Sequence, residues 1–212
     1  MKKLLLLHFA ATCLWAMNTV YADDPIHDHG YWQGTDIIDQ HVFDQPLADA
    51  MTSFFIKENA HTLVDFGCGM GDYVKWFLNA NFYCEGYDGN PKTYDLSDGY
   101  AYVLDLSQPF NFGKKFDLVV SLEVGEHIPQ RYETTFIDNL DRHVGKGIVL
   151  SWAVQGQGGF GHFNERDNSY IKKIMSKRGY VNDVETENFF RSRATQAWFK
   201  NTIMVFRKKG HG

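Results

Sequence analysis

Three alternating glycines, Gly67, Gly69 and Gly71, separate a short apolar run from a segment with helical periodicity. Glycines at such a turn let the backbone approach a ligand closely, at the positive end of the helix that follows. A dinucleotide fingerprint needs a further glycine where this chain has Asp72, and no Gly-Lys-Ser/Thr run follows that would form a P-loop. An acid at the helix start repels a pyrophosphate but tolerates an ammonium group, so the loop disfavours a dinucleotide and is compatible with a ligand that carries an ammonium group.

Acidic residues follow the next two predicted strands, with Asp88 after residues 82–87 and Asp105 after residues 100–104. A carboxylate at the end of a strand beside the glycine loop accepts hydrogen bonds from both hydroxyls of a ribose, which is the role we expect for Asp88. Taken alone, each acid has the alternative role of capping its own loop. Their order and spacing after the glycine loop favour a nucleoside-containing ligand.

An imidazole and two carboxylates follow the strand predicted at 116–122, as Glu123, Glu126 and His127. If residues 123–127 form a helical turn, these three side chains share one face, at positions i, i+3 and i+4. Such a cluster beside a ligand site suits removal of a proton from a nucleophile, with His127 as the base. The alternative is that His127 only caps or orients the turn.

Together, four segments resemble the motifs of the class I S-adenosylmethionine-dependent methyltransferases: residues 65–71, 85–91, 104–106 and 116–129. The resemblance covers about residues 60–152 and is only architectural from Ser151 to Arg207. It implies S-adenosylmethionine as methyl donor, with Asp65 near its methionine end and Asp105 on the adenine amine. The residues that it places around the cofactor are Asp65, Gly67, Cys68, Gly69, Gly71, Asp88, Gly89, Asp105, Leu106 and Leu122.

The implied reaction is transfer of a methyl group to a hydroxyl or other small polar acceptor by in-line displacement. Because the sulfonium already makes the methyl group electrophilic, alignment and exclusion of water supply most of the acceleration. Glu123, Glu126 and His127 are the predicted catalytic residues beside the acceptor. Two alternatives are a non-catalytic S-adenosylmethionine-binding or interaction module and an NAD-dependent oxidoreductase, which Asp72 disfavours.

The same acidic segment is similar to metal-binding segments of small-RNA 2′-O-methyltransferases and of ubiquinone-pathway O-methyltransferases. Those sites hold a divalent ion with two carboxylates and imidazole to activate a hydroxyl. Since many methyltransferases without a metal share Glu-His at this position, we expect no metal here. The alternative set of metal ligands is Glu123, Glu126, His127 and His162, the last of which follows a glycine-rich stretch at 156–161 that suits a mobile substrate loop.

The elements that position these residues alternate between strands and helices. Apolar spacing predicts helices at about 36–58, 73–79, 136–144 and 170–178, and strands at 63–66, 82–87, 100–104, 116–122, 147–152 and 202–206. The alternation predicts one α/β domain over 61–209: a single Rossmann-like, doubly wound, mostly parallel sheet, seven-stranded by the resemblance, with helices on both faces. A lid or helix segment is expected over 23–60, with Tyr31, Trp32, His41 and Phe43 as candidates to cover the ligand.

The first 22 residues have the layout of a secretory signal peptide: a basic start, an apolar run at 4–17 and small residues before Asp23. They predict a protein of the secretory pathway that is periplasmic or extracellular after cleavage. The alternative is an uncleaved N-terminal anchor, which is the one membrane contact we expect. A net charge of −5 without a basic stripe disfavours nucleic acid as a partner. The expected acceptor is a small molecule or a glycan-like or lipid-like compound.

Overall fold

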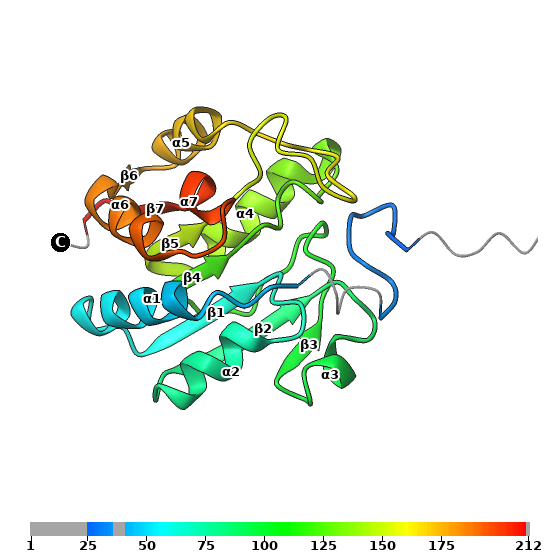
Figure 1. The fold of residues 1–212 in the computed structure, drawn as a ribbon, viewed down its shortest axis with the longest axis horizontal. Coiled ribbons are helices and arrows are strands. Elements are labelled where there is room, and N and C mark those ends of the chain that lie inside the picture. Colours follow the sequence, from blue (N-terminus) through cyan, green and yellow to red (C-terminus); the bar gives the residue numbers. More distant parts are fainter. Residues whose placement is uncertain (1–24, 36–40, 211–212) are drawn as a thin grey trace, which may run out of the picture.

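The computed structural model describes residues 25–35 and 41–210, which form one α/β fold (Figure 1). The predicted signal segment, residues 1–22, lies outside the described residues, as does the beginning of the helix predicted at 36–58. Within the described part of the chain, no helix is both long enough and apolar enough to cross a bilayer.

Seven strands form one sheet in the order β3-β2-β1-β4-β5-β7-β6. Their bounds are β1 Thr62–Phe66, β2 Tyr83–Asp88, β3 Ala101–Val103, β4 Phe116–Ser121, β5 Val144–Leu150, β6 Tyr180–Asn182 and β7 Met204–Lys208. Strands β1 to β5 pair in parallel, and β7 runs antiparallel to β5 and β6, so the predicted sheet is confirmed. Since the chain leaves β1 toward β2 and later returns to β4 on the other side of β1, the carboxyl ends of β1 and β4 form the crevice where ligands of such sheets bind.

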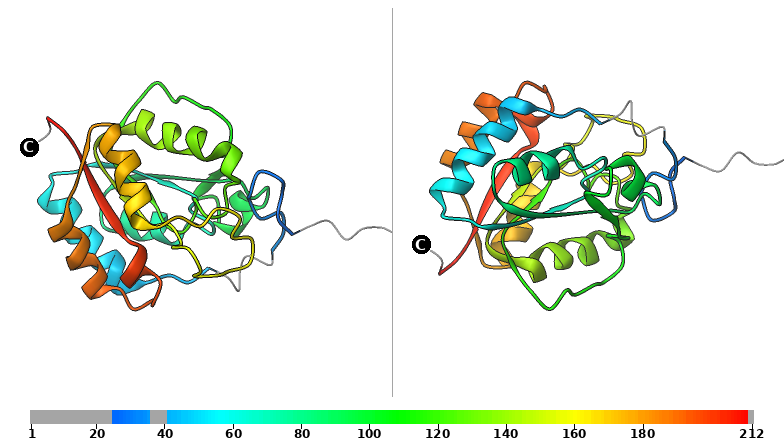
Figure 2. Two further views of the ribbon diagram at one scale, coloured as in Figure 1. Left: turned by 90° about the horizontal axis from the view of Figure 1, so that it is seen from above. Right: turned by 90° about the horizontal axis from the view of Figure 1, so that it is seen from below.

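Helices cover both faces of the sheet, as predicted (Figure 2). Their bounds are α1 Gln45–Lys57, α2 Asp72–Asn79, α3 Thr93–Leu96, α4 Glu133–His143, α5 Asn168–Lys177, α6 Val184–Arg193 and α7 Phe199–Thr202. Buried side chains of α1, α2 and α6 pack on one face of the sheet, and those of α4 and α5 pack on the other. Neighbouring residues of a strand serve opposite layers, because Leu63 packs with α1 and α2 while Val64 packs with α4.

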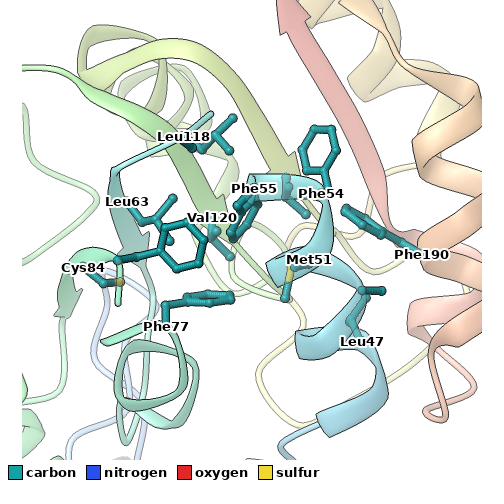
Figure 3. Packing of buried hydrophobic residues seen from close by; sticks show 14 of the residues in the cluster. Leu47, Met51, Phe54, Phe55, Leu63, Phe77, Cys84, Leu118, Val120 and Phe190 are labelled. Carbon is teal, nitrogen blue, oxygen red and sulfur yellow. The ribbon is translucent and has the colours of Figure 1, made fainter. Parts of the chain in front are cut away.

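Helix α1 shows why the helix predicted at 36–58 begins later in the structure. Asp44 caps its N-terminus by accepting a hydrogen bond from the Leu47 N–H at 3.2 Å. The same carboxyl group accepts hydrogen bonds from the backbone N–H groups of Thr195 and Gln196, at 2.7 and 2.9 Å. This ties the helix start to the segment before α7. The apolar side chains of α1 then fill the core between this helix layer and the sheet (Figure 3).

Two elements near the C-terminus lack the apolar periodicity on which the sequence prediction depends. Helix α6 buries just Glu187 and Phe190 among its ten residues, so no apolar stripe marks it. Strand β6 is three residues long and buries Tyr180. The strand predicted at 202–206 begins instead at Met204, because α7 takes up the residues before it.

Candidate active site

A cavity of about 290 Å³ opens at the carboxyl ends of β1, β2 and β4. This size is close to the lower end, about 300 Å³, of pockets that bind small molecules. The predicted residues that line it are Asp65, Gly67, Cys68, Asp88, Gly89, Asp105, Leu106, Leu122, Glu123, His127 and His162. Three predicted residues, Gly69, Gly71 and Glu126, do not line the cavity, and they act on it through their neighbours.

The glycine loop turns between β1 and α2 in a backbone conformation that favours glycine. Gly67, Gly69 and Gly71 have φ angles of +86°, +54° and +74°. A Cβ atom on Gly67 would lie 2.2 Å from a methyl group of Val124, so this position has no room for a side chain. Gly71 directly precedes α2 and caps it in the left-handed conformation. The loop therefore brings bare backbone and the helix N-terminus to the cavity, as the sequence predicts.

The carboxylate of Asp88 is fixed at the end of β2. One oxygen accepts a hydrogen bond from the Gly69 N–H and the other from the Asn90 N–H, both at 2.9 Å. Each oxygen keeps a second lone pair for a ligand. The side chain thus joins the glycine loop to the β2 loop and presents a bidentate acceptor to the cavity, which fits the predicted ribose contact.

Asp65 lies at the end of β1 and is 3% exposed. Burial raises the pKa of its carboxyl group to about 8, and the neighbouring Asp88 contributes to the rise. A buried carboxyl group of this kind ionises readily only when a cation approaches it. The ammonium group of a bound amino acid moiety is such a cation, so the position fits the predicted methionine end of the ligand.

Asp105 meets a residue that no local pattern identifies. One carboxylate oxygen accepts hydrogen bonds from the backbone N–H and the hydroxyl of Ser107, at 2.9 and 2.7 Å. The other lies 2.5 Å from Nδ1 of His29. His29 is separated from Asp105 by 76 residues, which is why its role was missed from the sequence. The acid predicted to contact adenine is therefore partly covered by the N-terminal segment.

The predicted helical turn at 123–127 is wrong. Glu123 adopts a left-handed φ of +53°, and the His127 N–H closes a tight turn onto the Val124 carbonyl at 3.0 Å. The cause is a long-range contact, because the Glu123 N–H donates to the Ser151 hydroxyl at 2.8 Å and draws the chain toward β5.

Glu123 and Glu126 have different hydrogen-bond partners, although their carboxyl groups lie close enough for Glu123 to raise the pKa of Glu126. The Glu123 carboxylate accepts hydrogen bonds from the Thr202 hydroxyl at 2.9 Å and from the Gln157 side-chain amide at 3.0 Å. Glu126 instead points into the protein and is fully buried. Glu123 is therefore fixed by side chains at the cavity, whereas Glu126 lies in the protein interior. The contacts of Glu123 with Thr202 and Gln157 could not be predicted from the sequence.

His127 presents an unprotonated nitrogen toward the site. Burial and the neighbouring His162 lower the pKa of the His127 imidazole to about 4, so the ring is neutral near pH 7. Its Nδ1 lies 3.0 Å from the Gly161 carbonyl, which can only accept, so Nδ1 carries the hydrogen and Nε2 keeps its lone pair. His162 is held in the same way, because its Nδ1 lies 3.1 Å from the Glu165 carboxylate.

Glu126, His127 and His162 bring one ligand atom each within 4.8 Å of one another. Within the described chain, neither Glu126 oxygen has a hydrogen-bond partner of good geometry. Backbone N–H groups and the Glu123 carboxyl group nevertheless lie near Glu126. Burial is the main cause that raises the pKa of Glu126, and the neighbouring Glu123 carboxyl group raises it further. A buried carboxyl group with no hydrogen bond of good geometry, beside two oriented imidazoles, is a donor set that suits a divalent cation. Three of the four alternative metal ligands thus come together, and Glu123 is occupied elsewhere.

The N-terminal segment at residues 26–35 lies across the loop ends of the sheet (Figure 1). A Cβ atom on Gly89 would lie 2.4 Å from the Tyr31 side chain. The Trp32 ring packs edge-on against His127 at 6.2 Å and against Phe160 at 5.4 Å between ring centroids. Tyr31 and Trp32 of this segment therefore line the cavity, which is the position expected of a lid.

Comparison with known proteins agrees with this geometry. The profile of a family described as "Methyltransferase domain" matches residues 38–201, which is more than half of the chain. A curated relative, a probable chloroplastic tocopherol O-methyltransferase of Oryza sativa subsp. japonica, is 29% identical over 127 residues. That match covers 52% of this chain and 34% of the relative, so the chain spans about a third of the relative's length.

Solved structures share the fold. The magnesium protoporphyrin IX methyltransferase of Synechocystis PCC 6803 with bound S-adenosylhomocysteine has a TM-score of 0.61 at 18% identity, over 78% of this chain and 83% of that one. An S-adenosylmethionine-dependent methyltransferase of Clostridium acetobutylicum ATCC 824 has a TM-score of 0.60 at 10% identity, over 82% and 95% of the two chains. With its matched profile, glycine loop and sheet order, this chain belongs to the class I S-adenosylmethionine-dependent methyltransferases.

Proposed function

We propose that this protein transfers a methyl group from S-adenosylmethionine to a hydroxyl group of a small molecule. The observation that carries the proposal is the one cavity that Asp88 and His127 line together. The described relative, by name a probable tocopherol O-methyltransferase, supports an oxygen acceptor. When bound, the cofactor supplies an electrophilic methyl group on a sulfonium.

The chain's own residues hold and orient the two reactants. Asp88 accepts the ribose hydroxyls, Asp105 the adenine amine, and Asp65 the ammonium group, which keeps this carboxyl group ionised. The Trp32 ring covers the cavity and excludes water beside His127. The Glu123 carboxylate, fixed by two hydrogen bonds, accepts a hydrogen bond from the acceptor hydroxyl and orients it for in-line attack.

The geometry favours a divalent cation at the acceptor side, against our expectation of no metal. We propose Glu126, His127 and His162 as its ligands, because one ligand atom of each lies within 4.8 Å of the others and because a contact at Nδ1 orients each imidazole ring. Such a cation lowers the pKa of a coordinated hydroxyl. A His127 pKa of about 4 suits a neutral ligand better than a general base, whose pKa works best near the operating pH.

Metal binding is tested apart from activity. Calorimetric titration of the chelator-treated protein with Mn²⁺ or Zn²⁺ is expected to give one site per chain. Glu126→Gln is expected to weaken binding about 100-fold, whereas the exposed His61→Ala leaves it unchanged. Equal metal affinity in the wild type and the Glu126→Gln variant would remove the proposed site.

The function itself is tested by S-adenosylhomocysteine release from the purified protein supplied with S-adenosylmethionine and hydroxyl acceptors. Release that depends on the acceptor supports the proposal. Binding of the donor without transfer to any acceptor would favour the non-catalytic alternative. Failure of the folded protein to bind the donor would refute both.

We also propose export through the predicted signal at residues 1–22. Mass spectrometry of the protein recovered outside the cytosol is expected to show Asp23 as the first residue. An intact N-terminus on a membrane-bound protein would support the anchor instead.

A further inference from the structure

The acceptor side of the cavity has a charge and a surface that select among hydroxyl compounds. Five carboxyl groups line the whole cavity: Asp65, Asp72, Asp88, Asp105 and Glu123. Three of them, Asp65, Asp88 and Asp105, are on the proposed cofactor side, and Glu123 is on the proposed acceptor side. Within residues 25–35 and 41–210, no lysine or arginine lines the same cavity. An acceptor with a further carboxylate or phosphate group would therefore meet the Glu123 carboxylate and no cationic side chain, because the proposed divalent cation would be occupied by the reacting oxygen.

Aromatic side chains form the wall next to the catalytic cluster. Trp32 comes from the N-terminal segment and Phe160 from the glycine-rich loop, and their ring centroids lie 5.4 Å apart at an interplanar angle of 43°. Phe160 is 58% exposed although it is a large apolar residue. Trp32 also packs edge-on against His127, so the aromatic surface continues to the site of chemistry. A planar ring is the ligand that such a wall contacts with the largest area.

Polar side chains on this side are already engaged. Both Glu123 oxygens accept hydrogen bonds within the protein, and the Gln157 amide is one of the two donors. A glycan-like acceptor needs several polar groups to match its hydroxyls, whereas the wall formed by Trp32 and Phe160 is aromatic. An aromatic acceptor with one hydroxyl group on its ring needs one hydrogen bond for that oxygen, and the rest of the molecule is apolar. Its pKa near 10 also makes its proton easier to remove than that of water, near 15.7.

We infer that the methyl acceptor is an uncharged aromatic compound that bears the reacting hydroxyl on its ring, held by Trp32 and Phe160. The inference rests on the proposed function and narrows its substrate class. In the reaction, the acceptor oxygen forms a bond to the methyl carbon while the carbon–sulfur bond breaks. The hydroxyl proton is lost to solvent and S-adenosylhomocysteine leaves as a neutral thioether.

Binding of matched ligands tests the inference independently of turnover. The protein saturated with S-adenosylhomocysteine is titrated with 2-naphthol and with 6-hydroxy-2-naphthoate, which differ by one carboxylate. We expect 2-naphthol to bind at least about tenfold more tightly, because the added carboxylate meets Glu123 and no cationic side chain. Equal affinity, tighter binding of the carboxylate, or binding of neither compound would overturn the inference.

Two pairs of variants test which side chains discriminate between the two naphthols. Val42 lines the cavity and is 44% exposed, so Val42→Lys places a cation in the wall without filling the core. We expect it to reduce the discrimination between the two naphthols at least about fivefold, and Val42→Leu to preserve it. Trp32→Ala is expected to weaken 2-naphthol binding about tenfold, whereas Phe189→Ala, outside the cavity, has no effect.

Affinity for S-adenosylhomocysteine separates this inference from the proposed function. It should stay within about twofold in all four variants, because none of these side chains is assigned to the cofactor. Unchanged discrimination in Val42→Lys together with unchanged 2-naphthol affinity in Trp32→Ala would overturn the inference even if methyl transfer is observed. Selective 2-naphthol binding without any methyl transfer would instead count against the proposed function alone.

Discussion

The cofactor side and the acceptor side of the cavity are built in different ways. The cofactor side consists of the loop at 67–71 and acids at the ends of neighbouring parallel strands, so each part is local in the chain. The acceptor side joins Trp32 of the N-terminal segment, the turn at 123–127, the loop at 156–162 and the start of α7. The comparison teaches that this chain encodes donor binding in short motifs and acceptor binding in long-range packing.

The largest expected effect lies on the acceptor side. His127→Ala should lower turnover about 100-fold to 1,000-fold, because it removes both the proposed cation ligand and the wall beneath Trp32. Affinity for S-adenosylmethionine should change less than about threefold, since the donor contacts lie on the other side. Steady-state kinetics and calorimetry measure the two effects, with the exposed His61→Ala as control. A parallel loss of donor affinity would mean that the two sides are not separable.

The next effect concerns the pH dependence of stability on the cofactor side. The Asp65 pKa is about 8 in the folded protein and 3.8 as its ordinary value. The folded state therefore holds the proton more tightly, and stability is full below about pH 4, falls as the pH rises to about 8 and is constant above that.

Asp65→Asn should remove this fall. We expect the free energy of unfolding of the wild type to drop by about 3 kcal/mol more than that of the variant between pH 5 and pH 8, after allowing for the water that reaches the cavity. Urea unfolding at the two pH values measures the difference. The same variant should bind S-adenosylmethionine more weakly. Identical pH profiles would show that Asp65 is not held protonated by burial.

Asp88→Ala should lower donor affinity about 10-fold to 100-fold, because charged hydrogen bonds contribute about 1.5–3 kcal/mol. The loss includes the contact that fixes the Gly69 N–H as well as the ribose contact. Calorimetry compares this variant with Asp49→Ala, whose exposed side chain lies on α1. If the donor binds equally well to the Asp88→Ala protein, the ribose assignment is wrong.

A smaller effect compares two glycines with similar backbone angles. Gly67 and Gly113 have φ angles of +86° and +68°, but a Cβ atom meets Val124 at Gly67 and open space at Gly113. Gly113→Ala should cost about 1 kcal/mol of stability from backbone strain alone. Gly67→Ala should cost about 1–3 kcal/mol more from overpacking. Equal costs, measured by thermal or urea unfolding, would show that the Gly67 turn has room to adjust.

The difference between the two sides also explains what the sequence predicts. Asp65, Gly67 and Asp88 line the cavity where the family resemblance and the spacing of their motifs place them, because these motifs follow the order of strands and loops. The sheet could be predicted for the same reason. Helix α6 and strand β6 could not be predicted, because too few of their residues are buried to give an apolar pattern.

The acceptor side is predictable in its residue types but not in its arrangement. Glu123, Glu126 and His127 are correctly assigned to the end of β4, yet their helical turn is wrong because Ser151, on a different strand exit, draws the backbone away. The cofactor side has one exception of the same kind, because His29 contacts Asp105 from a position 76 residues earlier and no local pattern marks it. Contacts between residues so far apart in the sequence form only when the sheet has folded, so the spacing of residues in the sequence does not predict them.

The central claim is that the cavity binds S-adenosylmethionine and its product through the acids of the cofactor side. Calorimetric titration of the purified protein with both compounds tests it most directly. The account predicts binding of each in the micromolar range, about −8 kcal/mol, with 1:1 stoichiometry and protons released below pH 8 as Asp65 ionises. Correctly folded protein that binds neither compound would contradict the account.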